Sequence, residues 1–260
     1  MQKVISKDGT SIAYEKVGKG PALILVDGAL CSRDFGPMRK IAELLSNNFT
    51  VYFYDRRGRN QSGDTKPYSV EHEVEDIEAL VKEANGPVYL AGSSSGAALA
   101  LRAAASGLNI AKLALFEPPY LKGAGGHEPP VDAQAQLQKR VDEGNRGAAV
   151  KYFMHDMVGL PSIMTAIFPI TPVWKKLKGV AHTLPYDAAV LGDFSIPLAL
   201  AKSIRIPTLV GAGTKSPKPM QDTMKRVVEA IPGSKLYMLK GQTHNASPKS
   251  LATMFTEFFN

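Results

Sequence analysis

The amino-acid sequence predicts an α/β protein in which a mainly parallel, eight-stranded sheet is flanked by helices and carries an inserted helical lobe. Short apolar runs, which are typical of strands buried on both faces, alternate along the chain with amphipathic or alanine-rich stretches. This alternation lapses between Leu121 and Ile196, where prolines and helical patches replace the buried strands. The length of 260 residues suits one large domain or a core with one inserted lobe.

The predicted strands follow one another in a simple order. The first two are joined as a hairpin by the turn signal Asp8-Gly9. The third, Ala22 to Val26, is a continuous apolar run that indicates a strand buried on both faces. The full set is Lys3 to Ser6, Ile12 to Val17, Ala22 to Val26, Val51 to Tyr54, Val88 to Ala91, Leu113 to Phe116, Thr208 to Gly211 and Leu236 to Leu239.

The predicted helices complete this pattern. The alanine-rich stretch Ala97 to Ala105 predicts a strong helix, and Leu251 to Phe259 predicts a closing one. We therefore expect residues 1–120 and 196–260 to form the core, with residues 121–195 inserted as a helical lobe.

Composition excludes several other classes of protein. Apolar residues make up 44% of the chain and charged ones 21%, which argues against disorder. A single cysteine, Cys31, excludes an internal disulfide framework and any cysteine-rich zinc site. The start of the chain lacks a signal-peptide pattern, and no apolar run is long enough to span a membrane. We expect a soluble, cytoplasmic protein.

The net charge of +7 raises the question of nucleic acid. Residues 196–260 hold nine basic and three acidic side chains, and these basic residues are scattered along the sequence. No stacking aromatics lie between them, so we interpret this excess as a solvated face. The sequence predicts no nucleic-acid or membrane partner, and it does not indicate an oligomeric state.

A tight turn at Ser94 carries the first chemical signal. The strand Val88 to Ala91 runs into Gly92-Ser93-Ser94-Ser95-Gly96, and a predicted helix follows directly. A G-x-S-x-G pentapeptide between a strand and a helix is typical of a nucleophile elbow, where close neighbours of the serine must be small. Ser94 would then lie at a helix N-terminus, where developing negative charge is favoured. The alternative is a Gly/Ser-rich connection without chemistry.

A serine nucleophile needs a base, and His244 is the best placed of five histidines. It follows the last predicted strand in a short loop, and parallel sheets present functional groups just beyond strand ends. The other four lie in polar stretches or in the predicted lobe.

Taken together, these motifs resemble the α/β-hydrolase superfamily, and in particular a cap-bearing serine hydrolase of the esterase/lipase type. The segment Leu25-Val26-Asp27-Gly28 is similar to the family's strand that ends in His-Gly, and Asp55 to Gly63 is similar to its Asp-x-Arg-Gly-x-Gly-x-Ser turn. The resemblance implies that residues 121–195 form the family's variable cap. It also implies an oxyanion hole made by the backbone N–H groups of Ala29 and Ser95.

The sequence departs from the family pattern at two places. Asp27 stands where the family has histidine, which changes the charge beside the oxyanion hole. The loop after Thr208 to Gly211, where the family's triad acid usually lies, holds no carboxylate before Asp222. Glu117, after the preceding predicted strand, is the best substitute, since some members of the superfamily place the acid there. Asp193, Asp222 or the lack of any acid stay open as alternatives.

The sequence therefore predicts hydrolysis of a carboxylic ester or lactone through an acyl-enzyme, without a cofactor or metal. Ser94 would be the nucleophile, His244 the base and Glu117 the acid. Candidate substrate-binding residues are Asp27, Gly28, Cys31 and Trp174. The same side chains would also suit carbon–carbon bond hydrolysis or acyl transfer, and the missing acid leaves open a non-catalytic, ligand-binding homologue.

Overall fold

The protein, as a computed structural model that describes residues 1–260, is built on one eight-stranded sheet. The strand order across the sheet is β1-β2-β4-β3-β5-β6-β7-β8, with β1–β2 and β2–β4 antiparallel and the other pairs parallel. The strands are β1 (Gln2–Ile5), β2 (Ser11–Val17), β3 (Ala22–Val26), β4 (Thr50–Tyr54), β5 (Val88–Ser93), β6 (Ile110–Phe116), β7 (Thr208–Gly213) and β8 (Lys235–Leu239). The predicted fold class is confirmed, including the opening hairpin.

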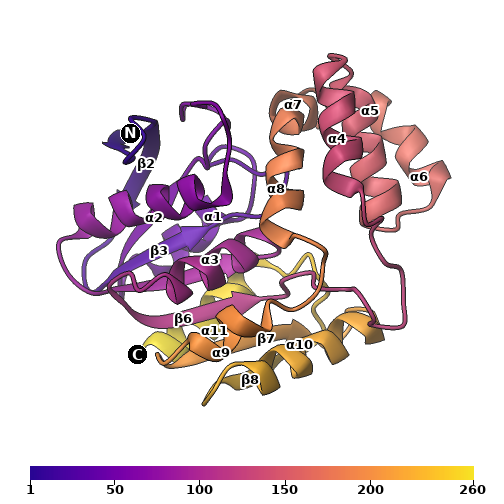
Figure 1. Ribbon diagram of the computed structural model, residues 1–260. Helices are drawn as coiled ribbons and strands as arrows, with labels where there is room; N and C mark the ends of the chain where they lie inside the picture. The colour runs from indigo at the N-terminus through magenta and orange to yellow at the C-terminus, as the bar shows by residue number, and fades with distance from the viewer.

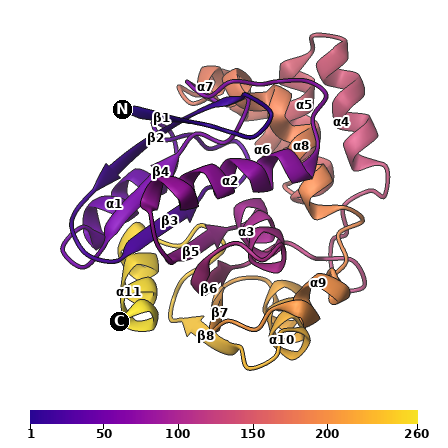
Figure 2. The same ribbon diagram turned by 60° about the vertical axis from the view of Figure 1, so that its left-hand side comes forward.

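Helices cover both faces of the sheet (Figures 1 and 2). Along β3, Leu23 and Leu25 pack with α1 (Met38–Leu45) and α11 (Pro248–Phe259) on one face. Ile24 and Val26 belong to the larger apolar core on the other face. That core includes α2 (Val70–Ala84), α3 (Ser95–Ala105), α9 (Leu198–Ser203) and α10 (Lys218–Ala230). Because both sides of β3 are buried, its sequence is an unbroken apolar run.

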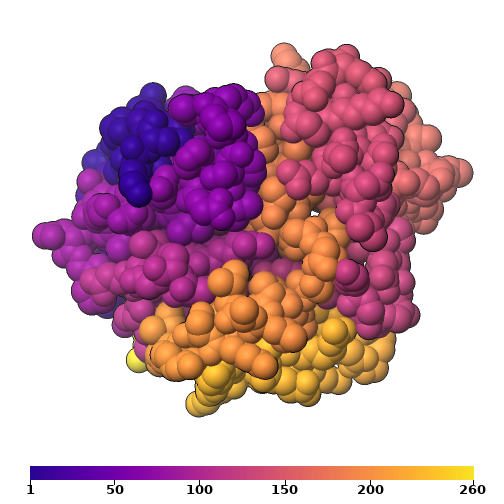
Figure 3. Space-filling model, viewed as in Figure 1, coloured from indigo at the N-terminus to yellow at the C-terminus, as the bar shows by residue number.

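The chain between β6 and β7 contains helices and no strand. We call residues 133–191 the helical segment, which lies at the upper right of Figures 1 and 3. Its last helix packs against both α4 and the core helix α3. The boundaries of a separate cap at residues 121 and 195 stay a prediction. The elements are α4 (Ala133–Asp142), α5 (Arg146–Tyr152), a π-helical turn (Phe153–Met157), α6 (Ser162–Ile167), a 3₁₀ turn (Phe168–Ile170), α7 (Trp174–Val180), a 3₁₀ turn (Ala181–Thr183) and α8 (Leu184–Leu191).

The register of the central strands brings separate parts of the sequence to one edge of the sheet. Ser93 of β5 pairs with Phe116 of β6, and Phe116 pairs with Gly211 of β7. The residues that follow these strands are therefore neighbours in space. None of the helices combines the length and apolar character that a membrane-crossing span requires.

Candidate active site

Ser94 occupies a sharp turn between β5 and α3. Its φ of 57° and ψ of −129° are unusual for a residue with a side chain, and such backbone strain costs about 1–3 kcal/mol. The turn is tight enough that a Cβ on Gly92 would collide with the backbone of Gly96. A Cβ on Gly96 would in turn strike the carbonyl oxygens of Val26 and Asp27. The small residues predicted around the serine are thus required by the close backbone packing.

Ser94, His244 and Glu117 form a continuous hydrogen-bonded chain. The Nε2 atom of His244 lies 3.2 Å from Ser94 Oγ, and its Nδ1 atom lies 2.8 Å from Glu117 Oε2. If Glu117 is a carboxylate, Nδ1 must carry the proton that is donated to it, so Nε2 is left to accept the proton of Ser94. The structure brings together all three residues that the sequence singled out, from the ends of β5, β6 and β8.

The backbone around β7 holds Glu117 in place. The Glu117 side chain is fully buried, and its Oε1 accepts a hydrogen bond of 2.8 Å from the N–H of Gly213. Its own N–H donates to the carbonyl of Gly211. A positive φ of 45° turns the residue out of the strand direction. Both carboxylate oxygens are therefore engaged, one by β7 and one by the histidine.

The other carboxylates considered as triad acids lie elsewhere. Asp193 is exposed and binds Lys122, with an Oδ2–Nζ distance of 2.7 Å. Asp222 lies on α10, with a half-exposed side chain, between Lys218 and Lys225. Neither contacts His244 in the structure, whereas Glu117 does.

The two predicted oxyanion-hole segments border the serine. Gly28, two residues beyond the end of β3, is so close that a Cβ added to it would lie 3.1 Å from the Ser94 Cβ, and Ala29 follows it directly. Ser95 is the first residue of α3 and is buried. The assignment of the Ala29 and Ser95 N–H groups as oxyanion donors stays a prediction.

Asp27 is buried beside the predicted hole. Its Oδ1 accepts a hydrogen bond of 3.1 Å from the N–H of Gly28. Burial raises the pKa of Asp27 from 3.8 to about 7, although Arg59 and the Gly28 N–H partly oppose this rise. Burial also raises the pKa of the Cys31 thiol well above its usual range, and the neighbouring Asp27 carboxylate adds to the effect. Cys31, which is half-buried, thus has the character of an unreactive thiol.

Trp174, the fourth candidate for substrate binding, begins α7. Its ring lies next to Gly147, where an added Cβ would be 3.1 Å from the indole, and the Nζ of Lys178 is 5.9 Å from the ring centroid. These contacts are all within the helical segment. A substrate-binding role for Asp27, Gly28, Cys31 and Trp174 stays a prediction.

A buried ionic network that the sequence did not predict contacts Gly28 and Ser95, beside the predicted hole. Arg56 binds both oxygens of Glu73, at 2.7 and 2.8 Å, and Arg59 binds both oxygens of Asp187, at 2.9 and 2.8 Å. All four side chains are at most 2% exposed. The one available signal was a single carboxylate, Asp187, in the otherwise uncharged stretch Leu184–Leu191.

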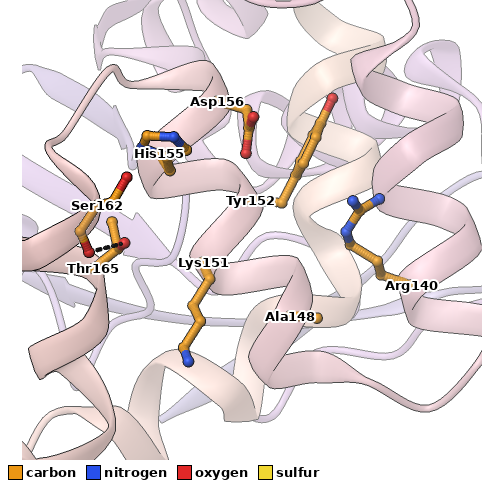
Figure 4. A pocket seen from close by; sticks show the side chains of 8 residues that line it. All are labelled: Arg140, Ala148, Lys151, Tyr152, His155, Asp156, Ser162 and Thr165. Carbon is orange, nitrogen blue, oxygen red and sulfur yellow. Dashed lines mark hydrogen bonds between the residues drawn. The ribbon is translucent and has the colours of Figure 1, made fainter.

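A separate shallow hollow of about 310 Å³ lies in the helical segment (Figure 4). It is lined by Arg140, Tyr152 and six other residues, none of which belongs to the hydrogen-bonded chain at Ser94. No group of three or more His, Cys, Asp or Glu side chains in the protein has an arrangement that could hold a metal ion.

Comparison with known proteins places this geometry in context. A solved alpha/beta hydrolase from Sphaerobacter thermophilus DSM 20745 is 47% identical, with a TM-score of 0.93 and full coverage of both chains. An uncharacterized hydrolase, YraK, from Bacillus subtilis is 38% identical over 97 residues, and an N-formylmaleamate deformylase from Pseudomonas putida is 37% identical over 120 residues. These two matches cover 36% and 44% of this chain, and 35% and 44% of the relatives' own lengths.

The match to a family model is more extensive than either curated match. The model of the alpha/beta hydrolase family matches residues 24–252, which include Ser94, Glu117 and His244. The chain therefore belongs to the alpha/beta hydrolase family.

Proposed function

We propose that the protein is a serine hydrolase that cleaves a carboxylic ester or lactone through an acyl-enzyme. The observation that carries this proposal is the unbroken hydrogen-bond chain from Glu117 through His244 to Ser94 Oγ, with distances of 2.8 and 3.2 Å. Nucleophile, base and orienting acid in hydrogen-bond contact are what acyl transfer by a serine requires.

In the first step, His244 Nε2 takes the proton of Ser94 as Oγ attacks the substrate's carbonyl carbon. The negative charge that develops on the carbonyl oxygen faces the N–H groups of Ala29 and Ser95, and each such donor is typically worth about 3–4 kcal/mol. The protonated His244 then passes its proton to the leaving group. Water, activated by the same nitrogen, hydrolyses the acyl-enzyme in the second step.

Glu117 assists both steps without touching the substrate. Its Oε2 accepts the Nδ1 proton of His244, which selects the tautomer that leaves Nε2 free, and its charge stabilises the imidazolium. Because Oε1 is held by the Gly213 N–H, the carboxylate cannot rotate freely away from the histidine. Glu117 thereby takes the part that the family usually gives to a residue after β7.

A serine nucleophile argues against haloalkane dehalogenase and epoxide hydrolase chemistry, since those reactions form an alkyl ester on a carboxylate. The same residues also suit two other reactions. One is hydrolysis of a carbon–carbon bond in a diketone, and the other is transfer of the acyl group to an acceptor other than water. The deformylase relative favours one further candidate in particular, cleavage of an N-formyl amide.

A substrate panel tests this proposal. The purified protein is assayed with short-chain p-nitrophenyl esters, a simple lactone, an N-formyl amide and a diketone, each alongside Ser94→Ala. We expect ester or lactone turnover that the variant abolishes. Turnover of the amide or diketone alone would replace the proposed reaction with one of the alternatives. Absence of turnover on every substrate would instead favour a ligand-binding protein.

A further inference from the structure

The buried network touches the peptide that would supply one oxyanion donor. Arg59 Nη1 donates a hydrogen bond of 2.6 Å to the carbonyl oxygen of Gly28, and a second of 3.1 Å to that of Cys31. The Gly28 carbonyl and the Ala29 N–H belong to the same planar peptide unit. A charged donor on the carbonyl therefore fixes the direction of the Ala29 N–H and draws electron density away from it.

The other oxyanion segment is connected to the same network. Ser95 Oγ donates to Asp187 Oδ1 at 2.7 Å, and Arg56 Nη1 donates to that oxygen at 2.6 Å. Arg56 Nη1 also lies 3.3 Å from Ser95 Oγ and 3.4 Å from the carbonyl oxygen of Asp27. Asp187 thus joins Ser95 on one side to the arginine that holds the Gly28–Ala29 peptide on the other.

We propose that Arg59 and Asp187 are positioning residues that hold the oxyanion hole in its working geometry. This inference rests on the proposed function, since it concerns the Ala29 and Ser95 donors of that mechanism. Asp187 lies on α8, in the helical segment, and Arg59 Nε also donates to Thr183 Oγ1 just before that helix. The segment between β6 and β7 therefore supports the hole as well as packing on α3.

Electrostatics support a fixed arrangement. The site is buried, and its positive and negative charges are equal in number. They belong to Arg56 and Arg59, and to Glu73 and Asp187. Burial alone would raise the pKa of Asp187, but the guanidinium groups of Arg59 and Arg56 outweigh it and hold the pKa below its usual range. Donors held by paired, buried charges need little rearrangement when negative charge develops on the substrate.

The test compares Arg59→Lys with a matched control, Arg57→Lys. Arg57 is equally buried and binds both oxygens of Asp76, at 2.7 and 2.8 Å, but it has no contact with the oxyanion segments. Both variants are measured for kcat and KM with p-nitrophenyl acetate and for melting temperature. A third readout is the affinity for a trifluoromethyl ketone, whose adduct with the serine carries the oxyanion.

For Arg59→Lys we expect kcat to fall about 10- to 100-fold with little change in KM. The single nitrogen of lysine cannot reproduce the separate bonds that Arg59 Nη1 and Nη2 make to Gly28 and Asp187. Affinity for the trifluoromethyl ketone should fall by the same factor. Arg57→Lys should leave both quantities within about threefold of wild type, whatever its melting temperature. If Arg59→Lys matches the control in kcat and inhibitor affinity, the positioning role is refuted.

A second variant covers the case in which Arg59→Lys does not fold. Asp187→Asn keeps the side-chain volume but weakens the link between Arg59 and Ser95, and the same two readouts decide the outcome by the same criteria. A wild-type protein that neither turns over the ester nor binds the ketone would refute the proposed function itself. If only the positioning role is wrong, the wild-type protein still turns over the ester and binds the ketone, and Arg59→Lys behaves like the control.

Discussion

Glu117→Gln tests how the acid after β6 serves the histidine. The side chain of Glu117 has two fixed neighbours, the Gly213 N–H at Oε1 and His244 Nδ1 at Oε2. A glutamine must place its carbonyl oxygen against the Gly213 N–H, because an amide NH₂ there would oppose another donor. Its NH₂ group then faces Nδ1, which must become an acceptor. The ring proton moves to Nε2, and His244 can no longer accept the proton of Ser94.

The expected loss follows from this wrong tautomer. Replacing the orienting acid of a serine triad by its amide lowers kcat by about 10⁴, and partial rescue by tautomer exchange gives a range of about 10²–10⁴ here. This corresponds to about 3–5 kcal/mol of transition-state stabilisation. The fold should survive, because the change preserves shape and keeps the bond to Gly213.

Steady-state kinetics with a p-nitrophenyl ester measure the effect, and circular dichroism with thermal melting checks the fold. Asp193→Asn and Asp222→Asn are matched controls, since both carboxylates were candidates for the same role and both bind lysines instead of His244. We expect the two controls to stay within a few-fold of wild type. A Glu117→Gln variant that also stays within a few-fold would refute the assignment of Glu117.

Two further predictions concern stability. The pKa of Asp27 is about 7 in the folded protein and near 3.8 when unfolded, so the folded state keeps a proton that the unfolded state releases. The stability of the wild-type protein therefore falls as pH rises between these values. In urea unfolding, the free energy of unfolding of Asp27→Asn relative to that of the wild type should increase by about 2–3 kcal/mol from pH 5 to pH 8. An equal difference at both pH values would contradict this. Gly96→Ala should lower the free energy of unfolding by about 1–3 kcal/mol or more, because the added Cβ meets the carbonyls of Val26 and Asp27. Gly86→Ala is the control and should not lower it, because a Cβ there meets no atom within 4 Å. Similar urea midpoints for the two glycine variants would count against the close packing at the elbow.

The centre of the sheet could be predicted from the sequence because strands such as β3 are buried on both faces. Ala22–Val26 has no polar residue to interrupt it, and its predicted bounds coincide with the observed strand. Strand ends were harder to predict, since β5 and β7 run on into Gly92, Ser93 and Gly213. Small residues there carry no apolar signal, although backbone pairing continues through them.

The contact between Ser94, His244 and Glu117 was predictable in part, because each residue follows a strand and parallel strands end at one edge. For Glu117 the signal in the sequence was that the loop after β7 lacks a carboxylate. The Gly213 N–H that holds the Glu117 side chain could not be predicted. The Asp187 network was not predictable. Its partners Arg56 and Ser95 lie 131 and 92 positions away, and only tertiary packing of α8 on α3 brings them together.

The most direct test of the central claim is whether Ser94 is an activated nucleophile. The wild-type protein is treated with a fluorophosphonate, digested, and analysed by mass spectrometry to find the modified residue. The proposed mechanism predicts one adduct, on Ser94, that is lost in Ser94→Ala and strongly slowed in His244→Ala. An unmodified wild-type protein, or an adduct that forms equally fast without His244, would contradict it.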